Sequence, residues 1–421
     1  MSTPRVLILA GGFGTRLASV VSDRPKPMAP IQGRPLLEYQ IEYLKNQGFA
    51  RFTLLTGHMS EVIEQHFGDG SRFGVAIDYS VETEPLGTGG AIRLAMEKSQ
   101  EDLFLVLNGD GLFATDYRRL LRLASGPVTL ALKFASDLSR FGAVEIDRAY
   151  AITHFLEKSN ALGDGYLNAG AYVIERAALA HMPVGKFSLE TQVFEPLSQK
   201  RVLLGIPCGG KFIDIGTPES FEWSQANLPQ WMQERFRPCL FLDRDGVLIR
   251  HVPYMHTIDK IELIAETVEL IKKAHVAGWW CIAITNQAGV ARGYFKPADC
   301  EKVRQEIDRR LNDLGVKIDH WFTCFNHPEG AVEPYKRSCL RRKPAPGMLL
   351  EACEAVPIDL SRSLMLGDNV SDQIQLPDLK TYLVEGDFKI DRVVQGNQVF
   401  SSFKDLALAV EKTIAESGAT K

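Results

Sequence analysis

Two patterns of hydrophobic and polar positions alternate along the chain. Short apolar runs are typical of buried strands, and between them apolar side chains recur every three or four positions, as on one face of a helix. In the stretch Leu36–Gln47, Leu37, Ile41 and Leu44 share such a face. The strands predicted in the first 230 residues are Val6–Ala10, Phe52–Thr56, Leu103–Leu107, Val128–Phe134 and Ala171–Ile174. This alternation predicts an α/β domain on a mostly parallel sheet.

The alternation starts again near residue 230. Prolines at positions 229 and 238 flank a stretch without a clear period. The elements predicted after it are strands at Cys239–Leu242, Cys281–Thr285 and Ser363–Leu366 and helices at Thr267–His275 and Asp299–Leu314. We therefore expect two doubly wound, mostly parallel α/β domains, residues 1–230 and 238–421, joined by a linker over 229–237. The last stretch, Ile414–Lys421, is expected to fray.

Composition narrows the classes of function. The 421 residues are 45% hydrophobic and 24% charged, which is ordinary for folded domains and excludes a mainly disordered chain. A formal net charge of −4 gives no reason to expect nucleic-acid binding. No apolar run approaches the ~18 residues of a membrane span, and the run at 6–10 is too short for a signal-peptide core. The seven cysteines are scattered, so we expect reduced thiols in a cytoplasmic protein.

The first predicted strand leads into a glycine-rich turn. Its small residues are Gly11, Gly12, Gly14 and Thr15. Glycines let the backbone approach a phosphate closely, so that successive N–H groups can line an anion site. Arg16 adds a fork of donors, and Lys26 stands between two prolines. Together these residues predict a site for a nucleotide triphosphate, although the glycines alone are equally typical of a tight turn between a strand and a helix.

Two aspartates in this half follow apolar runs. Asp110 comes after the strand that ends near residue 107, and Asp214 ends a run at 212–214. In open α/β sheets such strand ends face the ligand. Carboxylates from separate strand ends could share one Mg²⁺, whose other ligands would be phosphate oxygens. Upstream of both, a second glycine-rich turn at 84–91 makes Glu84 and Gly87 candidates for nucleotide binding.

The pattern GGxGTRL…PKP at residues 11–27, followed by these segments in the same order, resembles the sugar-phosphate nucleotidyltransferase family over residues 4–228. The resemblance implies a Rossmann-like fold and Mg²⁺ on Asp110 and Asp214. It also implies that Arg16 and Lys26 bind the triphosphate.

The same resemblance implies a sugar-phosphate subsite. Lys158 would hold the sugar 1-phosphate, and Glu157 and Asn168 would contact sugar hydroxyls, although Glu157 and Lys158 could also be a solvated surface pair. Residues 23–39 and 84–91 resemble the branch that uses GTP and D-glycero-α-D-manno-heptose 1-phosphate. Glu84 could accept hydrogen bonds from guanine N1–H and N2–H₂, or it could be an exposed loop residue.

A second polar group follows apolar runs in the other half. Asp243 and Asp245 stand two residues apart after a strand, so their side chains share a face. One carboxylate can attack phosphorus, and the other can donate and accept the proton that the reaction moves. Asp368, after another strand, could complete a Mg²⁺ site with them. Thr285 can hydrogen-bond a phosphoryl oxygen, and Lys343 can neutralise it.

The order Asp-x-Asp, Thr, Lys and Asp resembles the haloacid dehalogenase superfamily of phosphatases over residues 238–390. The resemblance implies a Rossmannoid fold with Asp243 as nucleophile and Asp245 as general acid and base. Asp368 would be a metal ligand. Asp372 would orient Lys343 or lie behind the metal ligands.

Within that superfamily, residues 252–256, 286–293 and 342–344 resemble phosphatases that remove the 7-phosphate of heptose 1,7-bisphosphate. Asn286, Arg292 and Arg342 are then candidates for binding the sugar phosphate, because arginine presents a bidentate fork to phosphate. A surface ion pair is the alternative for either arginine. Histidinol-phosphate phosphatases are the nearest rival family.

One loop departs from those phosphatases. They carry Cys-x-His and later Cys-x-Cys as a four-ligand zinc site, whereas here Asn326 and Arg341 replace one histidine and one cysteine. Cys324, His327 and Cys339 could still supply three ligands, but a cationic arginine at the fourth position opposes Zn²⁺. Structural zinc is therefore not expected.

The sequence thus predicts a bifunctional enzyme with Mg²⁺ in both domains and GTP and heptose phosphates as substrates. Two alternatives stay open: action on another sugar, such as mannose or glucose 1-phosphate, and one half serving as a silent sugar-nucleotide sensor. The sequence also leaves open whether the chain forms a homo-oligomer.

Overall fold

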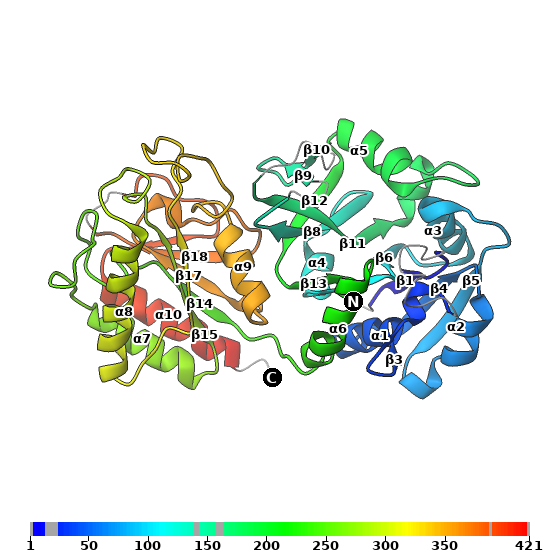
Figure 1. Cartoon of the computed structure of the whole chain (residues 1–421), viewed down its shortest axis with the longest axis horizontal. Helices are drawn as coiled ribbons and strands as arrows, with labels where there is room; N and C mark the ends of the chain where they lie inside the picture. Colours follow the sequence, from blue (N-terminus) through cyan, green and yellow to red (C-terminus); the bar gives the residue numbers. More distant parts are fainter. Residues whose placement is uncertain (1–2, 13–23, 139–142, 157–162, 387–389, 419–421) are drawn as a thin grey trace. The chain divides into compact units, whose positions relative to one another are not determined.

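The computed structural model describes residues 3–12, 24–138, 143–156, 163–386 and 390–418. It divides into two compact units, Met1–Glu234 and Arg235–Lys421, each with its own main sheet (Figure 1). Five predicted site residues lie outside the described residues: Gly14, Thr15, Arg16, Glu157 and Lys158.

The described part of the first unit contains a nine-stranded sheet. Its strands are β1 (Arg5–Leu9), β4 (Arg51–Thr56), β5 (Ala76–Val81), β6 (Leu103–Asn108), β8 (Val128–Ala135), β9 (Ala143–Ile146), β10 (Ile152–Leu156), β11 (Gly165–Glu175) and β12 (Leu203–Cys208). The main path runs β10-β9-β11-β6-β1-β4-β5, and β8 joins β11 to β12. β10 and β11 run against the other strands, so the sheet is mixed but mostly parallel, which confirms the predicted fold class.

Besides short 3₁₀ and π turns, two small ribbons and six α-helices complete the described part of this unit. They are β2 (Pro30–Ile31) with β3 (Arg34–Pro35), β7 (Gly111–Ala114) with β13 (Lys211–Asp214), α1 (Leu36–Asn46), α2 (Ser60–Phe67), α3 (Gly87–Lys98), α4 (Tyr117–Leu123), α5 (Glu195–Gln199) and α6 (Pro218–Trp231). The central strand β1 shows why the sheet is buried: Val6, Leu7 and Ile8 are fully covered, as expected of a strand with helices on both faces.

The first residues of the stretch expected as a linker, 229–237, are helical, because α6 continues through Pro229 to Trp231. Proline lacks the N–H that would bond the carbonyl four residues earlier. That carbonyl belongs to Gln225, and it accepts a hydrogen bond of 2.7 Å from Gln32 Nε2 instead. A side chain from another segment therefore replaces the missing helical bond and allows the helix to run on.

The second unit is built on a parallel sheet with the order β16-β15-β14-β17-β18-β19. These strands are β14 (Cys239–Leu242), β15 (Trp280–Asn286), β16 (His320–Cys324), β17 (Leu364–Gly367), β18 (Lys380–Val384) and β19 (Gln398–Phe400). The helices are α7 (Ala265–Val276), α8 (Pro297–Asp313), α9 (Gly347–Ala355) and α10 (Phe403–Gly418). α7, α8 and α10 share one apolar core with the sheet, and α9 is drawn on the other side of the sheet (Figure 1).

The prediction that the chain frays from residue 414 is wrong as far as Gly418. Leu406, Val410 and Ile414 recur every four residues on α10 and are buried in the core of the second unit. Ser417 Oγ accepts a hydrogen bond of 3.1 Å from Trp279 Nε1. This apolar stripe extends the helix almost to the end of the chain.

Within the described residues, no helix combines the length and apolar character that crossing a membrane requires.

Candidate active sites

The first site lies where β6 and β13 end. Asp110 comes two residues after β6, and Asp214 is the last residue of β13. β13 pairs antiparallel with β7, and this register places Asp214 opposite Gly111. Two aspartates that are 104 positions apart in the sequence therefore become neighbours, as their strand-end positions indicated.

A lysine lies between these two carboxylates. Lys26 Nζ is 2.9 Å from Asp110 Oδ2 and 2.9 Å from Asp214 Oδ1. The lysine side chain is buried, whereas both carboxylates are nearly half exposed. One cation thus already bridges two hard oxygen ligands, which is the donor set that suits Mg²⁺. The residues fit a divalent cation, and the predicted contact of Lys26 with the triphosphate stays a prediction.

A buried glutamine braces the turn that carries Asp110. Gln40, from α1, donates from Nε2 to Asn108 O at 2.8 Å and also to Gly111 O. These two carbonyls flank Asp110 in the sequence, so the hydrogen bonds from Gln40 fix the shape of the turn. Sequence reasoning missed this residue, and the only signal was a polar side chain on an otherwise apolar helical face.

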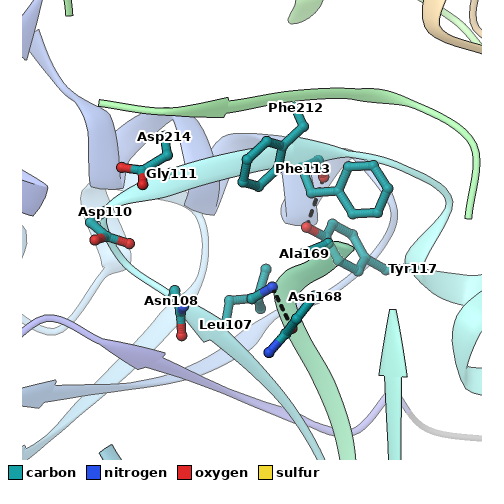
Figure 2. Close-up of a pocket in the computed structure, with 11 residues that line it drawn as sticks. Leu107, Asn108, Asp110, Gly111, Phe113, Tyr117, Asn168, Ala169, Phe212 and Asp214 are labelled. Atoms are coloured by element: carbon teal, nitrogen blue, oxygen red, sulfur yellow. Dashed lines mark hydrogen bonds between the residues drawn. The ribbon is translucent and has the colours of Figure 1, made fainter. Parts of the chain in front are cut away.

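A pocket of about 280 Å³ lies beside the carboxylates (Figure 2). Asp110 and Asp214 lie toward one side of it, and Asn168 of β11 lies toward the other (Figure 2). Asn168 is held in place by donating to Tyr172 Oη at 3.2 Å and accepting from Gly170 N at 3.0 Å. Burial raises the pKa of Tyr172, so its hydroxyl stays protonated. The structure therefore brings the predicted sugar contact and the predicted metal ligands to one pocket.

The two glycine-rich segments, at residues 11–12 and 84–91, have different surroundings. Gly11 and Gly12 come two and three residues after the end of β1, the neighbour of β6. Gly87 begins α3 with φ +72°, and a Cβ there would lie 2.6 Å from Phe187 O. Close packing of two backbones is enough to require this glycine. Glu84 is exposed, so its predicted contact with guanine stays a prediction.

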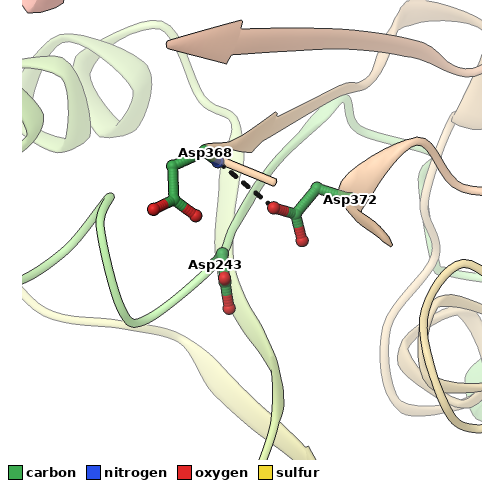
Figure 3. A group of neighbouring side chains, drawn as sticks. All are labelled: Asp243, Asp368 and Asp372. Atoms are coloured by element: carbon green, nitrogen blue, oxygen red, sulfur yellow. Dashed lines mark hydrogen bonds between the residues drawn. The ribbon is translucent and has the colours of Figure 1, made fainter. Parts of the chain in front are cut away.

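The second site gathers three aspartates at the carboxyl edge of the parallel sheet (Figure 3). Asp243 follows β14, Asp368 follows the adjacent β17, and Asp372 lies in the turn after it. One oxygen of each lies within 4.8 Å of the others, and within the described residues this is the only such group of three potential ligands. Hard carboxylate oxygens in this number suit a divalent cation such as Mg²⁺.

Lys343 ties this cluster together. Its Nζ lies 2.8 Å from Asp243 Oδ1 and 2.6 Å from Asp372 Oδ1, and the side chain is almost fully buried. Asn286, predicted to bind the sugar phosphate, holds the lysine backbone: its Nδ2 donates to Lys343 O and its Oδ1 accepts from Lys343 N, both at 3.1 Å. Asp372 Oδ2 also accepts from the backbone N–H of Asp368 at 3.2 Å. The lysine is thus fixed both at its backbone and at its charged end.

Asp245, predicted as a metal ligand, is not part of the aspartate group. Its carboxylate is held by the guanidinium of Arg244 and by Gln287 Nε2, which donates at 2.8 Å. The physical reason is that Arg244 is buried and needs a counter-charge beside it. Thr285, also buried, accepts from Gln287 Nε2 at 2.9 Å. Asp372 takes the place in the group that the sequence assigned to Asp245.

Burial favours the protonated forms of Asp368 and Asp243, because it raises the pKa of both. Burial, and then the nearby charges of Asp243 and Asp372, together raise the pKa of Asp368 to about 8. Burial likewise raises the pKa of Asp243 to about 7, against the opposing effect of Lys343. Burial opposes the charge on Lys343, but the two aspartates beside it raise its pKa above the ordinary value. The lysine therefore stays charged, while the excess negative charge is offset by protons or by a cation.

These shifts predict a pH-dependent effect of Mg²⁺ on stability. Unfolded aspartates titrate near pH ~4, so between that pH and about 8 the folded metal-free protein binds more protons than the unfolded chain. Its free energy of unfolding therefore falls as pH rises through this window. Mg²⁺ replaces those protons, so the stabilisation by a fixed Mg²⁺ concentration should grow from pH 6 to pH 8.5. Urea unfolding with Mg²⁺ or EDTA measures it, and an increment that stays flat or shrinks would contradict the assignment.

Two arginines, Arg292 and Arg342, form a cationic rim, and His327 lies beside them. Arg292 Nη1 donates to Tyr254 Oη at 2.6 Å, and Arg342 Nη1 donates to Asn326 O at 3.3 Å. Burial, and then the charge of Arg292, lower the pKa of Arg342. Burial and the same two arginines lower the pKa of His327. The charge of Arg292 lowers the pKa of both neighbours, so the three groups lie close together, as expected for a site that takes an anion.

Two thiols lie close together in the loop where Asn326 and Arg341 replace the expected zinc ligands. The sulfurs of Cys324 and Cys339 lie 3.6 Å apart, while His327 Nδ1 accepts from Glu329 N at 3.1 Å. Arg341, at the lost ligand position, pairs with Glu351 at 2.9 Å. The expectation that this loop packs without zinc stays a prediction.

Comparison with known proteins identifies both units. The family described as nucleotidyl transferase matches residues 5–230, and the family described as polynucleotide kinase 3 phosphatase matches residues 240–401. D-glycero-alpha-D-manno-heptose 1-phosphate guanylyltransferase of Aneurinibacillus thermoaerophilus is 39% identical over 230 residues, which are 54% of this chain and 99% of that protein. D-glycero-beta-D-manno-heptose-1,7-bisphosphate 7-phosphatase of Escherichia coli K12 is 38% identical over 135 residues, 32% of this chain and 71% of that protein.

A solved structure of HddC from Yersinia pseudotuberculosis, complexed with GMP-PN, is 32% identical and covers 53% of this chain and 98% of that one, with a TM-score of 0.49. The sequence matches confirm both predicted resemblances. The chain therefore belongs to the nucleotidyl transferase family through its first unit and carries a haloacid dehalogenase-like phosphatase as its second, which makes it a bifunctional sugar-phosphate nucleotidyltransferase and phosphatase.

Proposed function

We propose that the chain catalyses two consecutive steps in the formation of GDP-heptose. The phosphatase unit removes the 7-phosphate of D-glycero-α-D-manno-heptose 1,7-bisphosphate, and the other unit transfers GMP from GTP to the heptose 1-phosphate, releasing pyrophosphate. One observation carries this proposal: the relatives of the two units are named for the 1,7-bisphosphate and the 1-phosphate of one heptose, and removal of the 7-phosphate converts the first into the second when both have the same anomer.

In the phosphatase unit, Asp243 is the nucleophile. Its carboxylate oxygen attacks phosphorus, the bond from phosphorus to the sugar oxygen breaks, and Asp245 gives its proton to that oxygen. Water then attacks the aspartyl phosphate, Asp245 takes a proton from it, and Asp243 is released with inorganic phosphate. Lys343, which contacts Asp243 at 2.8 Å, offsets the charge on the phosphoryl oxygens. Asp243 and Asp368 would hold Mg²⁺, which would screen the repulsion between carboxylate and phosphate.

In the transferase unit, the sugar 1-phosphate is itself the nucleophile. Its oxygen attacks the α-phosphorus of GTP, and the bond to the pyrophosphate oxygen breaks. The attacking oxygen is already anionic, so this chain needs only to align two repelling anions and offset the charge on the leaving group. Asp110 and Asp214 would hold the Mg²⁺ that supplies part of this charge compensation. Lys26, which contacts both carboxylates, is placed to supply the rest.

Substrate profiling of the separate reactions tests the assignment of sugar and base. Among nucleotides, we expect a higher kcat/KM for transfer from GTP than from dTTP, UTP or ATP. Among sugars, we expect a higher kcat/KM with heptose 1-phosphate than with mannose or glucose 1-phosphate. The curated relatives differ in anomer, alpha for the transferase and beta for the phosphatase. A shared intermediate requires one anomer, and we assign alpha. A preference for mannose 1-phosphate, or for the β-bisphosphate, would contradict that assignment.

The cationic rim predicts how the bisphosphate is selected. Methionine at Arg292 or Arg342 should raise KM for heptose 1,7-bisphosphate by ~10-fold or more, because a charge-assisted fork to the 1-phosphate is lost. The same variants should change KM for heptose 7-phosphate far less, since that ester has no second phosphate to bind. Steady-state kinetics with both esters check this. Equal losses with the two esters would show that the rim does not bind the 1-phosphate.

A further inference from the structure

Arg244 stands between Asp243 and Asp245 in the sequence, and the mechanism proposed above gives it no role. Its Nε and Nη2 lie 2.8–3.2 Å from both oxygens of Asp245, a side-on fork on one carboxylate. The Arg244 side chain is 3% exposed and that of Asp245 is 20% exposed. Solvent therefore screens this pair little, and the pair constrains the Asp245 side chain strongly.

Gln287 closes the arrangement from the other side. Its Oε1 accepts from Arg244 Nη2 at 3.0 Å, and its Nε2 donates to Asp245 Oδ2 at 2.8 Å. Gln287 is itself fixed, because it is buried and its backbone N–H donates to Cys324 O at 2.8 Å. Arg244, Gln287 and Asp245 thus form a closed ring of hydrogen bonds in which each side chain contacts the other two.

The ring gives Asp245 a different cationic partner from that of Asp243. Lys343 contacts Asp243 and Asp372, whereas Arg244 contacts Asp245 through its side chain. Each catalytic carboxylate therefore has its own cation, and neither needs to turn toward the cation of the other. A catalytic group must be held within ~0.5 Å and 10–20° of its productive geometry, and a forked guanidinium fixes a carboxylate plane in a way that lysine cannot.

The ring also reaches Thr285. The hydroxyl of Thr285 accepts from Gln287 Nε2 at 2.9 Å, so its own proton remains for another acceptor. The phosphoryl oxygen of the proposed reaction is such an acceptor. One glutamine amide group thus orients the proton-transfer carboxylate and a phosphate-binding hydroxyl together.

We propose that Arg244 and Gln287 are positioning residues that hold Asp245 where it protonates the leaving oxygen and later accepts the proton of water. The inference rests on the proposed phosphatase function. It implies that their loss slows the proton-transfer parts of the reaction and leaves the attack of Asp243 on phosphorus largely intact.

The experiment compares two phosphate esters that differ in their need for a proton. An alkyl ester, heptose 7-phosphate, needs protonation of its leaving oxygen, whereas p-nitrophenyl phosphate releases a stable anion without it. Arg244→Met should lower kcat/KM for the alkyl ester by ~100-fold, the size of general acid catalysis, and for the aryl ester by less than ~10-fold. Stopped-flow should also show a burst of one p-nitrophenolate per site, because water attack on the aspartyl phosphate becomes slow.

Three further variants make the result decisive. Arg250→Met is the matched control, since Arg250 is exposed and pairs with Glu262 on the same segment, and it should match the wild type. Arg244→Lys should recover only part of the alkyl-ester rate. Gln287→Met should shift the ratio between the esters in the same direction by a smaller factor, and it decides the question if Arg244→Met does not fold.

Equal losses with both esters and no burst would show a merely structural role and overturn the proposal, as would a Gln287→Met protein that matches the wild type with both esters. Absence of turnover of either ester by the wild-type protein would overturn the proposed phosphatase itself, and this outcome is distinguishable from a failure of the positioning role.

Discussion

Asparagine in place of Asp243 is expected to lower phosphate release from heptose 1,7-bisphosphate by ~10⁴-fold or more, the scale of removing a nucleophile from covalent catalysis. A carboxamide cannot form the aspartyl phosphate, and it also leaves Lys343 with Asp372 as its one remaining partner in this cluster. GMP transfer from heptose 1-phosphate should keep the wild-type rate, because the first unit has its own sheet and pocket. Phosphate and pyrophosphate release, assayed separately, measure the two activities.

The matched control for this variant is Asp299→Asn. Asp299 lies in the first turn of α8 and pairs with Lys302 at the surface, so the same chemical change there should leave both activities intact. An Asp243→Asn protein that is folded and still releases phosphate at a tenth of the wild-type rate would exclude Asp243 as the nucleophile. Loss of GMP transfer in that folded protein would contradict the independence of the two sites.

Asparagine in place of Asp110 is expected to have the reverse effect. It should lower GMP transfer by ~10²–10³-fold, the size seen when one group that stabilises developing charge is removed. The change takes one of two carboxylates from the proposed Mg²⁺ site and one of the two ion-pair partners described for Lys26. Phosphate release from the bisphosphate should stay at the wild-type rate. Pyrophosphate release over a range of Mg²⁺ concentrations measures the effect, which excess Mg²⁺ should relieve only in part.

Asp78→Asn is the control in this unit, because Asp78 forms an exposed ion pair with Arg5 on β5 and β1, far from the chemistry proposed. Its transfer rate should equal that of the wild type. A wild-type transfer rate in the Asp110→Asn protein would rule out Asp110 as a metal ligand, whatever the phosphatase does.

The edge of each sheet at which the candidate site residues lie follows from the sequence. Asp243 and Asp368 come directly after β14 and β17, Asp110 comes two residues after β6, and parallel strands end at a common edge. The order of motifs then distinguishes the two families. These predictions are possible because hydrophobic periodicity determines where strands begin and end, and this periodicity can be read from the sequence.

Which side chains meet at that edge does not follow from the sequence. Asp245 was predicted to join Asp243 and Asp368, but a buried Arg244 recruits it, and Asp372 joins the group instead. Such choices depend on burial and on counter-charges from distant segments, such as Lys343. Gln40 is a further example, because its contacts with the turn that carries Asp110 exist only once α1 packs against that turn. The continuation of α6 past Pro229 depends in the same way on Gln32.

The central claim is that one chain performs two consecutive steps on one sugar. The most direct test mixes the purified protein with Mg²⁺, an equimolar set of nucleoside triphosphates and D-glycero-α-D-manno-heptose 1,7-bisphosphate, and follows the products by mass spectrometry. The account predicts GDP-heptose, with one phosphate and one pyrophosphate for each molecule formed. Accumulation of heptose 1-phosphate without any sugar nucleotide, or no turnover of the bisphosphate at all, would contradict it.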